Sequence, residues 1–483
     1  MRIAGVHIQE AEKDWKTQHA VSEPYGLEMI LAIAKQEGHE VELFISNKDG
    51  EVTEQVSAFK PDIAAFSLYT FQYNTGRKIA ANLKKLIPGL VTVAGNRYPT
   101  FLKDKISDEF DFFAINEGEQ TFRELIAAMG NGRHYQDVRG LVFKEDNRPV
   151  FTGVRERNFN LDSLPDALRF PAILSQVYRA ISIPPLSSNP HYAVIESSRC
   201  CYNNCKFCDN EGFWGNKVTF RSPERVVAEM AKLKQVGVDI FYFMDLNFSA
   251  FPEKAEKLCK EMINQKLNTS WYCMSNVATL DNKRGKELLS LMKEAGCFKI
   301  AYGVESTNDV SLEKMNKKVG KKFTTTEQMI RVLENSLEAG MINQGFYIIG
   351  FPWESRESIA NDAKGIKNIP VHQLNIGIFT PIPLSRFYSD MINEGYIINP
   401  NLECHDRNTL VFNHRNLCET TGNVMEDMAR GNSVIKQLQQ EIYEGFYSTP
   451  EFLSRVRKTC DIEPRLKQGF NDYFQFIGRE IRV

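Results

Sequence analysis

Short apolar runs alternate with helical patterns along the first part of the chain. Runs of strand length cover residues 3–8, 41–45, 63–68, 90–94 and 112–115. Between them, apolar positions recur at helical spacing, as in Leu27, Ile30, Leu31 and Ala34, and further helices are expected near 76–87 and 119–129. Strands that alternate with helices in this way predict an α/β fold. We expect a doubly wound, Rossmann-like domain with a five-stranded parallel sheet over residues 1–135.

Ligands of such a sheet bind outside the carboxyl ends of its strands. Three of the predicted strand ends carry the segments Ser67-Leu-Tyr-Thr70, Gly95-Asn-Arg-Tyr-Pro99 and Asn116-Glu-Gly-Glu119. The residues expected to form a ligand site in this domain come from these segments. They are Tyr69, Thr70, Gly95, Asn96, Arg97 and Glu117.

A hairpin and linker, residues 136–189, separate this domain from a second α/β pattern. The runs 141–143 and 150–151 predict the hairpin, and tandem prolines at Pro184 and Pro185 mark the boundary. Six strands are expected near 194–198, 239–244, 270–275, 299–303, 344–349 and 372–379. Helices are expected near 223–236, 252–266, 284–295, 325–339 and 355–367. The pattern predicts a partial, TIM-like (β/α)6 barrel over residues 190–383 and a helical C-terminal domain over 384–483, with the chemistry at the carboxyl ends of the barrel strands.

Composition and charge narrow the class of protein. The 483 residues are 42% hydrophobic and 25% charged, which is ordinary for a globular protein, and the formal net charge is −2. That balance indicates neither a nucleic-acid partner nor an anionic membrane surface. No apolar run approaches the roughly 20 residues of a membrane helix, and the first residues have no signal-peptide core. We therefore expect a soluble, cytoplasmic protein with no membrane span.

Four of the ten cysteines lie within residues 200–208. Cys201, Cys205 and Cys208 have the spacing C-x3-C-x2-C, whereas the position of Cys200 does not fit that spacing. Three thiolates on one short loop can hold three irons of a [4Fe–4S] cluster and leave the fourth iron open. Structural zinc would require a fourth ligand at short spacing, and the sequence offers none. The sequence therefore predicts Cys201, Cys205 and Cys208 as cluster ligands.

This cysteine segment resembles the motif of the radical S-adenosylmethionine enzymes, and the resemblance extends over about residues 190–380. It implies that S-adenosylmethionine chelates the open iron and is cleaved reductively to a 5′-deoxyadenosyl radical. The implied S-adenosylmethionine contacts follow the cysteines and the strand ends: Phe207, Asp245, Asn247, Tyr302, Glu305, Ile348 and Ile349. Ser275-Asn276-Val277 stands where many relatives have an arginine. The lysine-rich stretch 314–322 also resembles a family segment, and we expect it to be a solvated basic face.

The first domain resembles the cobalamin-binding domain that precedes the barrel in many of these enzymes. The similar segments are Gly38-His-Glu-Val-Glu42, Lys60-Pro-Asp-Ile63 and Glu117-Gly-Glu119. No Asp-x-His-x-x-Gly is present, so the resemblance implies no histidine ligand to cobalt. Where a Gly-Gly-Pro pattern is expected, the chain has Gly95-Asn96-Arg97, with larger side chains in the path of the corrin. The domain therefore either binds cobalamin at the strand-end residues named above or is an empty sheet domain.

The resemblance implies a radical enzyme that uses a [4Fe–4S] cluster, S-adenosylmethionine and cobalamin, with an electron donor such as flavodoxin or ferredoxin. Two reaction types are open. One is cobalamin-dependent methyl transfer to an unactivated carbon of a small-molecule, lipid or natural-product precursor. The other is a radical rearrangement, dehydration, cyclisation or deoxygenation without methyl transfer. The sequence indicates no further catalytic residue.

Overall fold

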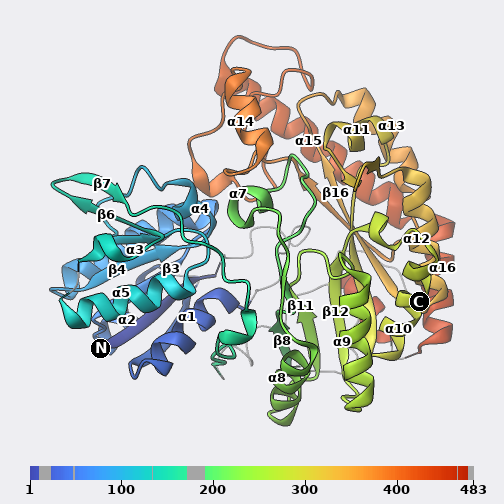
Figure 1. Ribbon diagram of the computed structural model, residues 1–483. Coiled ribbons are helices and arrows are strands. Elements are labelled where there is room, and N and C mark those ends of the chain that lie inside the picture. The colour runs from blue at the N-terminus through green and yellow to red at the C-terminus, as the bar shows by residue number, and fades with distance from the viewer. Residues whose placement is uncertain (10–22, 47–48, 133, 171–190, 465, 477–483) are drawn as a thin grey trace.

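The computed structural model describes residues 1–9, 23–46, 49–132, 134–170, 191–464 and 466–476. Figure 1 shows a front α/β domain, coloured blue to cyan, beside a second α/β unit in green and yellow. Helices of the C-terminal region, in orange and red, lie against the far side of the second unit. None of the helices within these ranges is long and apolar enough to cross a membrane.

The front domain is built on a seven-stranded sheet with the order β2-β1-β3-β4-β5-β6-β7. The first five strands are parallel: β1 (Arg2–Ile8), β2 (Glu40–Ser46), β3 (Ile63–Ser67), β4 (Val91–Gly95) and β5 (Phe112–Ala114). They confirm the predicted doubly wound sheet. The predicted hairpin, β6 (Leu141–Glu145) and β7 (Arg148–Phe151), pairs antiparallel with β5 and extends the sheet to seven strands.

Helices cover both faces of this sheet. On one face, α1 (Tyr25–Gln36) and α5 (Glu119–Asn131) bury leucine and isoleucine side chains against β1 and β3. On the other face, α2 (Asp49–Phe59) and α3 (Tyr73–Leu86) form a second apolar cluster, and the short α4 (Arg97–Phe101) follows β4. Apolar side chains on both faces explain why these strands are near-continuous hydrophobic runs in the sequence.

The second unit is an open barrel of six parallel strands in the order β17-β16-β13-β12-β11-β8. Its strands are β8 (Tyr192–Ile195), β11 (Ile240–Phe243), β12 (Ser270–Ser275), β13 (Cys297–Glu305), β16 (Ile342–Ile349) and β17 (Gln373–Ile378). The helices between them are α8 (Pro223–Gln235), α9 (Pro252–Asn264), α10 (Lys283–Glu294), α12 (Thr326–Glu338) and α13 (Arg356–Ile366). The predicted (β/α)6 architecture is confirmed.

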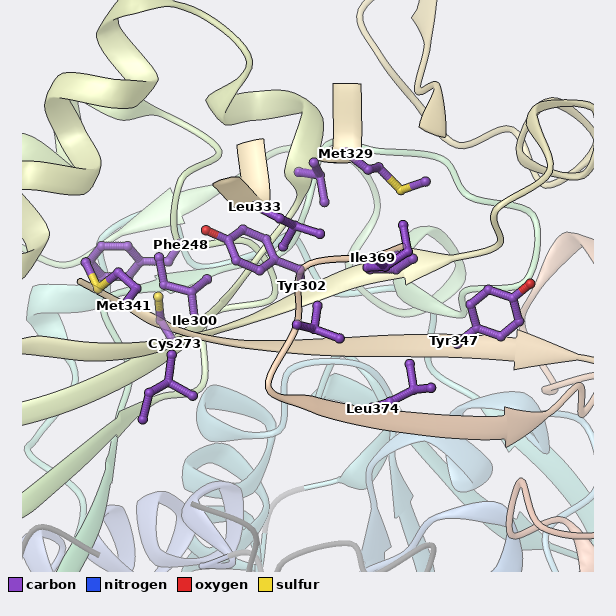
Figure 2. Packing of buried hydrophobic residues seen from close by; sticks show 14 of the residues in the cluster. Phe248, Cys273, Ile300, Tyr302, Met329, Leu333, Met341, Tyr347, Ile369 and Leu374 are labelled. Carbon is purple, nitrogen blue, oxygen red and sulfur yellow. The ribbon is translucent and has the colours of Figure 1, made fainter. Parts of the chain in front are cut away.

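Side chains alternate along the barrel strands between the helix layer and the interior. Figure 2 shows the helix side of β13, where Ile300 and Tyr302 pack with Leu333 of α12 and with Phe248. The neighbouring residues Ala301 and Gly303 point the other way and line an internal cavity. This period of two decides which residues of each strand can reach a ligand.

An open barrel has two edge strands whose backbone groups need partners. At β17 the hydroxyls of Tyr443 and Tyr447 accept hydrogen bonds from the N–H groups of Ile376 (2.8 Å) and Leu374 (3.0 Å). Both tyrosines belong to α15 (Val424–Tyr447), the longest helix of the C-terminal region. The predicted helical C-terminal region therefore covers one edge of the barrel. Its other helices are α14 (Arg386–Asn393), α16 (Pro450–Ile462) and α17 (Leu466–Phe476).

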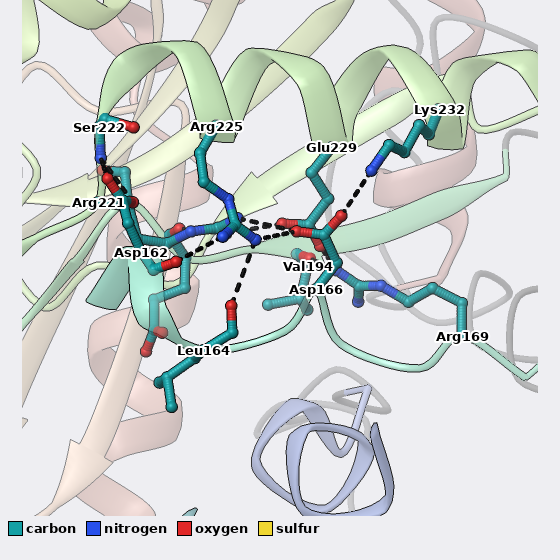
Figure 3. A network of polar contacts seen from close by, with 12 residues as sticks. Asp162, Leu164, Asp166, Arg169, Val194, Arg221, Ser222, Arg225, Glu229 and Lys232 are labelled. Carbon is teal, nitrogen blue, oxygen red and sulfur yellow. Dashed lines mark hydrogen bonds and ion pairs between the residues drawn. The ribbon is translucent and has the colours of Figure 1, made fainter. Parts of the chain in front are cut away.

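The opposite edge strand, β8, is covered by charged side chains from the front domain and the linker. Arg169 donates to the Val194 carbonyl (2.7 Å), and Glu23 accepts from the Val194 N–H. Arg169 also pairs with Glu23, with Glu28 of α1 and with Glu229 of α8 (2.8 Å). Figure 3 shows Arg169 and Val194 with Glu229 of α8. One buried guanidinium thus joins the front domain, the linker and the barrel.

One carboxyl of this network has a strongly shifted pKa. Burial, with repulsion from Glu23, raises the pKa of Glu28 well above its usual value and so favours its uncharged form. The remaining carboxylates, Glu23 and Glu229, then face the two guanidiniums of Arg169 and Arg221, the latter 2.6 Å from Glu229. The network therefore depends on both arginines.

Replacing the central arginine should destabilise the protein. Arg169→Met leaves the buried Glu23 carboxylate without its arginine, whereas Glu229 keeps Arg221, and breaking a buried pair costs about 3–5 kcal/mol. The midpoint of urea unfolding should fall accordingly. Arg331→Met is the matched control, because Arg331 pairs with Asp281 (2.8 Å) on the surface, where ion pairs contribute little, and it should leave the midpoint close to that of the wild type. Equal midpoints for the two variants would show that the network does not hold the domains.

Candidate active site

The cysteine loop follows β8 and is closed at its base by a short antiparallel ribbon. Its strands are β9 (Ser198–Arg199) and β10 (Thr219–Phe220). Within the loop, the Asn210 side chain donates to the Cys201 carbonyl (2.6 Å) and accepts from the Cys201 N–H (3.2 Å). Neighbouring segments also bind the loop, since the Lys206 N–H donates to the Met315 carbonyl (2.9 Å). The loop is therefore fixed by hydrogen bonds before any cofactor binds.

Cys201, Cys205 and Cys208 all line one cavity of about 400 Å³ at the carboxyl ends of the barrel strands. Among the described residues, no three His, Cys, Asp or Glu side chains converge closely enough to hold one metal ion. A [4Fe–4S] cluster is larger than a single ion, and it holds its thiolates further apart than zinc does. The donor set and the surrounding cavity therefore fit a cluster with one open iron.

The fourth cysteine of the loop occupies a different position. Cys200 is buried outside the cavity, and its thiol lies 3.3 Å from the Gly215 carbonyl. Its φ of +79° places it in the left-handed region that favours glycine. This geometry supports the interpretation that Cys200 is not a ligand.

The buried environment affects the three ligand thiols strongly. Burial raises the pKa of Cys201 and of Cys205 to about 11, and that of Cys208 to about 12. These thiols are therefore protonated at neutral pH when no metal is bound. Iron must displace three protons when it binds, as metal binding to thiols generally does.

Glu305, a predicted S-adenosylmethionine contact, lies in the cavity beside a lysine that the sequence analysis placed on a solvated face. Lys317 is instead buried, and its ammonium donates to Glu305 Oε1 (2.8 Å). The pKa of Lys317 is raised, because the Glu305 carboxylate and the nearby thiols outweigh the opposing effect of burial. Among the described residues, Glu305 Oε2 has no protein hydrogen bond, so it can accept from a ligand hydroxyl.

The backbone around Glu305 is adapted to this pair. Glu305 has a φ of +65°, and the register of β13 against β16 shifts between Gly303 and Glu305. A Cβ at Gly303 would lie 2.4 Å from Glu305 Oε1 and 2.7 Å from Lys317 Nζ. A larger residue at position 303 would displace this ion pair, so the glycine lets the pair take the position that the structure shows.

Several buried polar atoms of the cavity have no protein partner. The side-chain nitrogens of Asn203 and Asn247 and Nη1 of Arg97 are buried without a hydrogen bond in the described part of the chain. All three residues line the cavity. Leaving such donors unpaired costs free energy, so a ligand rich in acceptors would satisfy them. S-adenosylmethionine is such a ligand, because its ribose and carboxylate oxygens and its adenine nitrogens accept hydrogen bonds.

The front domain contributes to the same cavity. Tyr69, Thr70, Phe71 and Arg97 line it from the carboxyl edge of the front sheet. The rings of Tyr69 and Phe71 stack, with centroids 5.8 Å apart and planes 8° from parallel, and Tyr69 is 43% exposed. An exposed flat aromatic pair opposite the cysteine loop fits a large planar cofactor held between the domains.

The two bulky residues after β4 are accommodated without filling this space. Asn96, at a φ of +85°, turns its side chain back to Ser67 Oγ (3.0 Å) and to the Arg97 N–H (2.8 Å). The Arg97 guanidinium lies over the Phe213 ring (4.3 Å) and 3.4 Å from Asp209. The larger side chains are therefore held by the protein itself.

Several residues that were predicted to form the site lie away from this cavity. Tyr302 is fully buried against the helices, and Ile349 also belongs to that core. Ile348 is partly buried and, like Gly95, is not among the lining residues, whereas its strand neighbour Phe346 is. The alternation of side chains explains the misplacement of Tyr302, because the strand end at Tyr302-Gly-Val-Glu presents its glycine and its glutamate to the cavity.

Two predicted acidic residues are engaged in protein contacts. Asp245 accepts from the Ser197 N–H (3.0 Å) and hydroxyl (2.6 Å), and it lines a second cavity between α8 and α9. Glu117 pairs with Arg199 (3.3 Å) and Arg157 (3.5 Å). Both carboxylates therefore have a structural role, at the base of the cysteine loop and between the domains respectively.

The lining also contains residues that the sequence analysis did not assign to a site. They are Phe71, Asn203, Asp209, Asn210, Leu246, Met274, Ala301, Gly303, Lys317, Phe346, Thr380, Ile382, Pro383, His405 and Arg407, in addition to Ser275 and Asn276 of the segment noted above. Every second residue of a barrel strand faces the interior, and this alternation would have indicated Met274, Ala301 and Phe346. His405 and Arg407 come from the C-terminal region, where no sequence pattern indicated a site.

Comparison with known proteins agrees with this geometry. Residues 195–366 match the radical SAM superfamily, and residues 18–126 match the B12 binding domain. The chain therefore carries a radical SAM domain behind a B12 binding domain, and these domains imply a radical enzyme that uses a [4Fe–4S] cluster, S-adenosylmethionine and cobalamin.

Individual relatives extend over most of the chain. A Pyrococcus horikoshii protein named an uncharacterized methyltransferase is 26% identical over 438 residues, 89% of each chain. The solved structure of the radical S-adenosylmethionine methyltransferase TsrM from Kitasatospora setae aligns with 83% of this chain over 80% of the TsrM chain. The sequence identity is 16% and the TM-score is 0.67. The cobalamin-dependent S-adenosylmethionine radical enzyme OxsB covers 99% of this chain and 75% of its own, with 13% identity and a TM-score of 0.70. These structures share the fold.

The cysteine assignment predicts distinct effects of two alanine substitutions. Cys205→Ala should lose the cluster and abolish reductive cleavage of S-adenosylmethionine, because one of three thiolate ligands is missing. Cys200→Ala, the matched control on the same loop, should retain about four irons per chain. Iron and sulfide analysis with electron paramagnetic resonance of the reduced protein measures both. Equal loss of iron in the two variants would contradict the assignment.

The Glu305–Lys317 pair should bind cofactor more than it stabilises the fold. The double variant Glu305→Gln/Lys317→Met removes both charges and leaves no buried charge unpaired. A lost charge-assisted hydrogen bond is worth about 1.5–3 kcal/mol, so the affinity for S-adenosylmethionine should fall roughly 10 to 150-fold. Anaerobic equilibrium dialysis measures this affinity. The midpoint of thermal unfolding of the double variant should stay close to that of the wild type. Glu305→Gln alone should lower this midpoint, because it leaves Lys317 unpaired. Unchanged affinity would assign the pair to the fold.

Proposed function

We propose that this protein is a cobalamin-dependent radical methyltransferase that methylates an unactivated carbon of a small-molecule, lipid or natural-product precursor. The observation that carries the proposal is the shared cavity. The cluster cysteines, the barrel strand ends and the carboxyl edge of the front sheet all line it. A methyl donor bound at the front sheet and a radical generator bound at the barrel would therefore act on one substrate carbon.

The residues of the chain have separable roles in this proposal. When bound, the cluster and S-adenosylmethionine would supply a hydrogen-abstracting radical, and cobalamin would supply a transferable methyl group. Cys201, Cys205 and Cys208 hold the cluster, while Asn247 and Glu305 orient S-adenosylmethionine. Tyr69 and Thr70 present the front-domain cofactor to the cavity. Its apolar lining, which includes Phe207 and Phe346, excludes water from the reacting carbon.

The reaction needs electrons from outside the chain. A low-potential donor such as flavodoxin or ferredoxin would supply two electrons in each turnover, one for the reductive cleavage of S-adenosylmethionine and one to return cobalamin to the state that accepts a methyl group. All ten cysteines are free thiols, as expected in a reducing compartment such as the cytoplasm. We therefore place the enzyme there, with a small-molecule substrate and without a nucleic-acid partner.

Product analysis separates methyl transfer from the other radical reactions. A methyltransferase of this type consumes two molecules of S-adenosylmethionine per turnover, one as methyl donor and one as radical source. Turnover should therefore yield S-adenosylhomocysteine and 5′-deoxyadenosine in near-equal amounts. A mutase, dehydratase or cyclase would yield 5′-deoxyadenosine without coupled S-adenosylhomocysteine. Protein prepared without cobalamin is the control, and it should form no S-adenosylhomocysteine.

A further inference from the structure

One wall of the cavity comes from a loop of the C-terminal region. An antiparallel bridge between Ile398 and Phe412 closes its base, and the Asn399 N–H donates to the Val411 carbonyl (2.7 Å). We call residues 399–411 the C-terminal loop. It contacts the front domain as well as the barrel, since Glu403 lies 3.8 Å from Lys78 and Leu402 packs on the front-domain core. The loop is thus held on both sides of the cavity.

This loop turns two polar side chains to the cavity. His405 is 6% exposed, and its Nε2 lies 2.8 Å from the Asn399 carbonyl. A carbonyl can only accept, so Nε2 carries the proton. Nδ1 of the neutral ring is then an acceptor, and it is buried with no partner in the described part of the chain. Burial lowers the pKa of His405, which keeps the ring neutral near pH 7.

Arg407 supplies the second group. Its backbone is fixed, because its carbonyl accepts from the Ile378 N–H at the end of β17 (2.8 Å). Its side chain is exposed and lines the cavity. Among the described residues, the guanidinium has no ion pair or hydrogen bond. The loop backbone thus fixes the position of an arginine whose charge is free to bind a ligand.

The other charges of the lining are already paired within the protein. Arg97 pairs with Asp209 (3.4 Å), and Glu305 pairs with Lys317 (2.8 Å). Within the described ranges, Arg407 is therefore the unmatched charge of the cavity wall. A cavity with one unmatched guanidinium selects an anionic ligand group, since guanidinium binds carboxylate and phosphate with two parallel hydrogen bonds.

On this basis we infer that the substrate carries a carboxylate or phosphate that binds Arg407, next to a hydrogen-bond donor that binds Nδ1 of His405. This inference rests on the proposed function, because it concerns the substrate of the same cavity. The C-terminal loop approaches the cavity from the end of β17, whereas the lining residues assigned to S-adenosylmethionine are Phe207 on the cysteine loop, Asn247 after β11 and Glu305 at the end of β13. Arg407 is therefore a specificity-determining residue.

The first test follows a labelled methyl group into an anionic product. The reduced holoenzyme is incubated with methyl-labelled S-adenosylmethionine and a deproteinised metabolite extract of the native host. Products are then separated by anion exchange at about pH 10, where α-amino groups are uncharged. A reaction without extract identifies unreacted S-adenosylmethionine and the labelled methionine that its reductive cleavage releases, and the further label that depends on the extract should appear in retained fractions. Prior treatment of the extract with alkaline phosphatase distinguishes a phosphate from a carboxylate, because only a phosphate ester would be lost.

Variants at Arg407 assign the effect to this residue. Arg407→Gln should lower the initial rate of label transfer, at limiting extract, about 10 to 150-fold, the value of one charge-assisted hydrogen bond. Arg407→Lys should recover part of it. Arg457→Gln, at an exposed arginine of α16, should match the wild type. Label that depends on the extract and appears in unretained fractions overturns the inference. So does a loss of S-adenosylmethionine or cobalamin affinity in Arg407→Gln, which would assign the arginine to a cofactor.

A second test does not depend on methyl transfer. Arginines of the holoenzyme are modified with phenylglyoxal, and the modified residues are identified by mass spectrometry of peptides. The extent of modification in acetate or inorganic phosphate is compared with that in chloride at equal ionic strength. The two oxyanions should protect Arg407 several-fold more than Arg457. Equal protection of both arginines overturns the inference. Selective protection of Arg407 without any label transfer by the wild type would leave the anion site standing and contradict the proposed methyl transfer instead.

Discussion

An open barrel leaves backbone N–H and C=O groups unpaired along its two edge strands. The rest of this structure depends on which side chains form hydrogen bonds with those groups. At β17 the partners are tyrosine hydroxyls of α15, and at β8 they are Arg169 and Glu23. Unpaired strand edges are costly and aggregation-prone. The flanking domains are therefore parts of the barrel's own hydrogen bonding, and the buried charges at β8 hold the front sheet with its carboxyl edge against the cavity.

The sequence predicts the strands of both sheets because buried parallel strands are continuous apolar runs between helical patterns. It also predicts the cysteine loop, where the spacing of three thiols has few other interpretations. The directions of individual side chains are less accessible to sequence reasoning. Tyr302 was expected in the site, yet the alternation along β13 turns it into the helix layer and brings Gly303 into the cavity.

Residues brought in from distant segments were the hardest to predict. Lys317 belongs to a lysine-rich stretch of the kind that is usually solvated, and only the folded chain shows that it is buried on Glu305. His405 and Arg407 lie about a hundred residues further on, in a segment without helical or strand periodicity. Their place in the cavity follows from the pairing of the C-terminal loop with the end of β17, which is a tertiary contact.

The protonated state of the cysteine loop has a consequence for the life of the protein before its cofactor arrives. Thiolates, rather than thiols, attack disulfides and are oxidised by peroxide. With pKa values near 11 to 12, Cys201, Cys205 and Cys208 are almost entirely thiols in a newly folded chain. The burial that raises these pKa values therefore also favours the thiol form, which is the form that resists mixed disulfides and sulfenic acids.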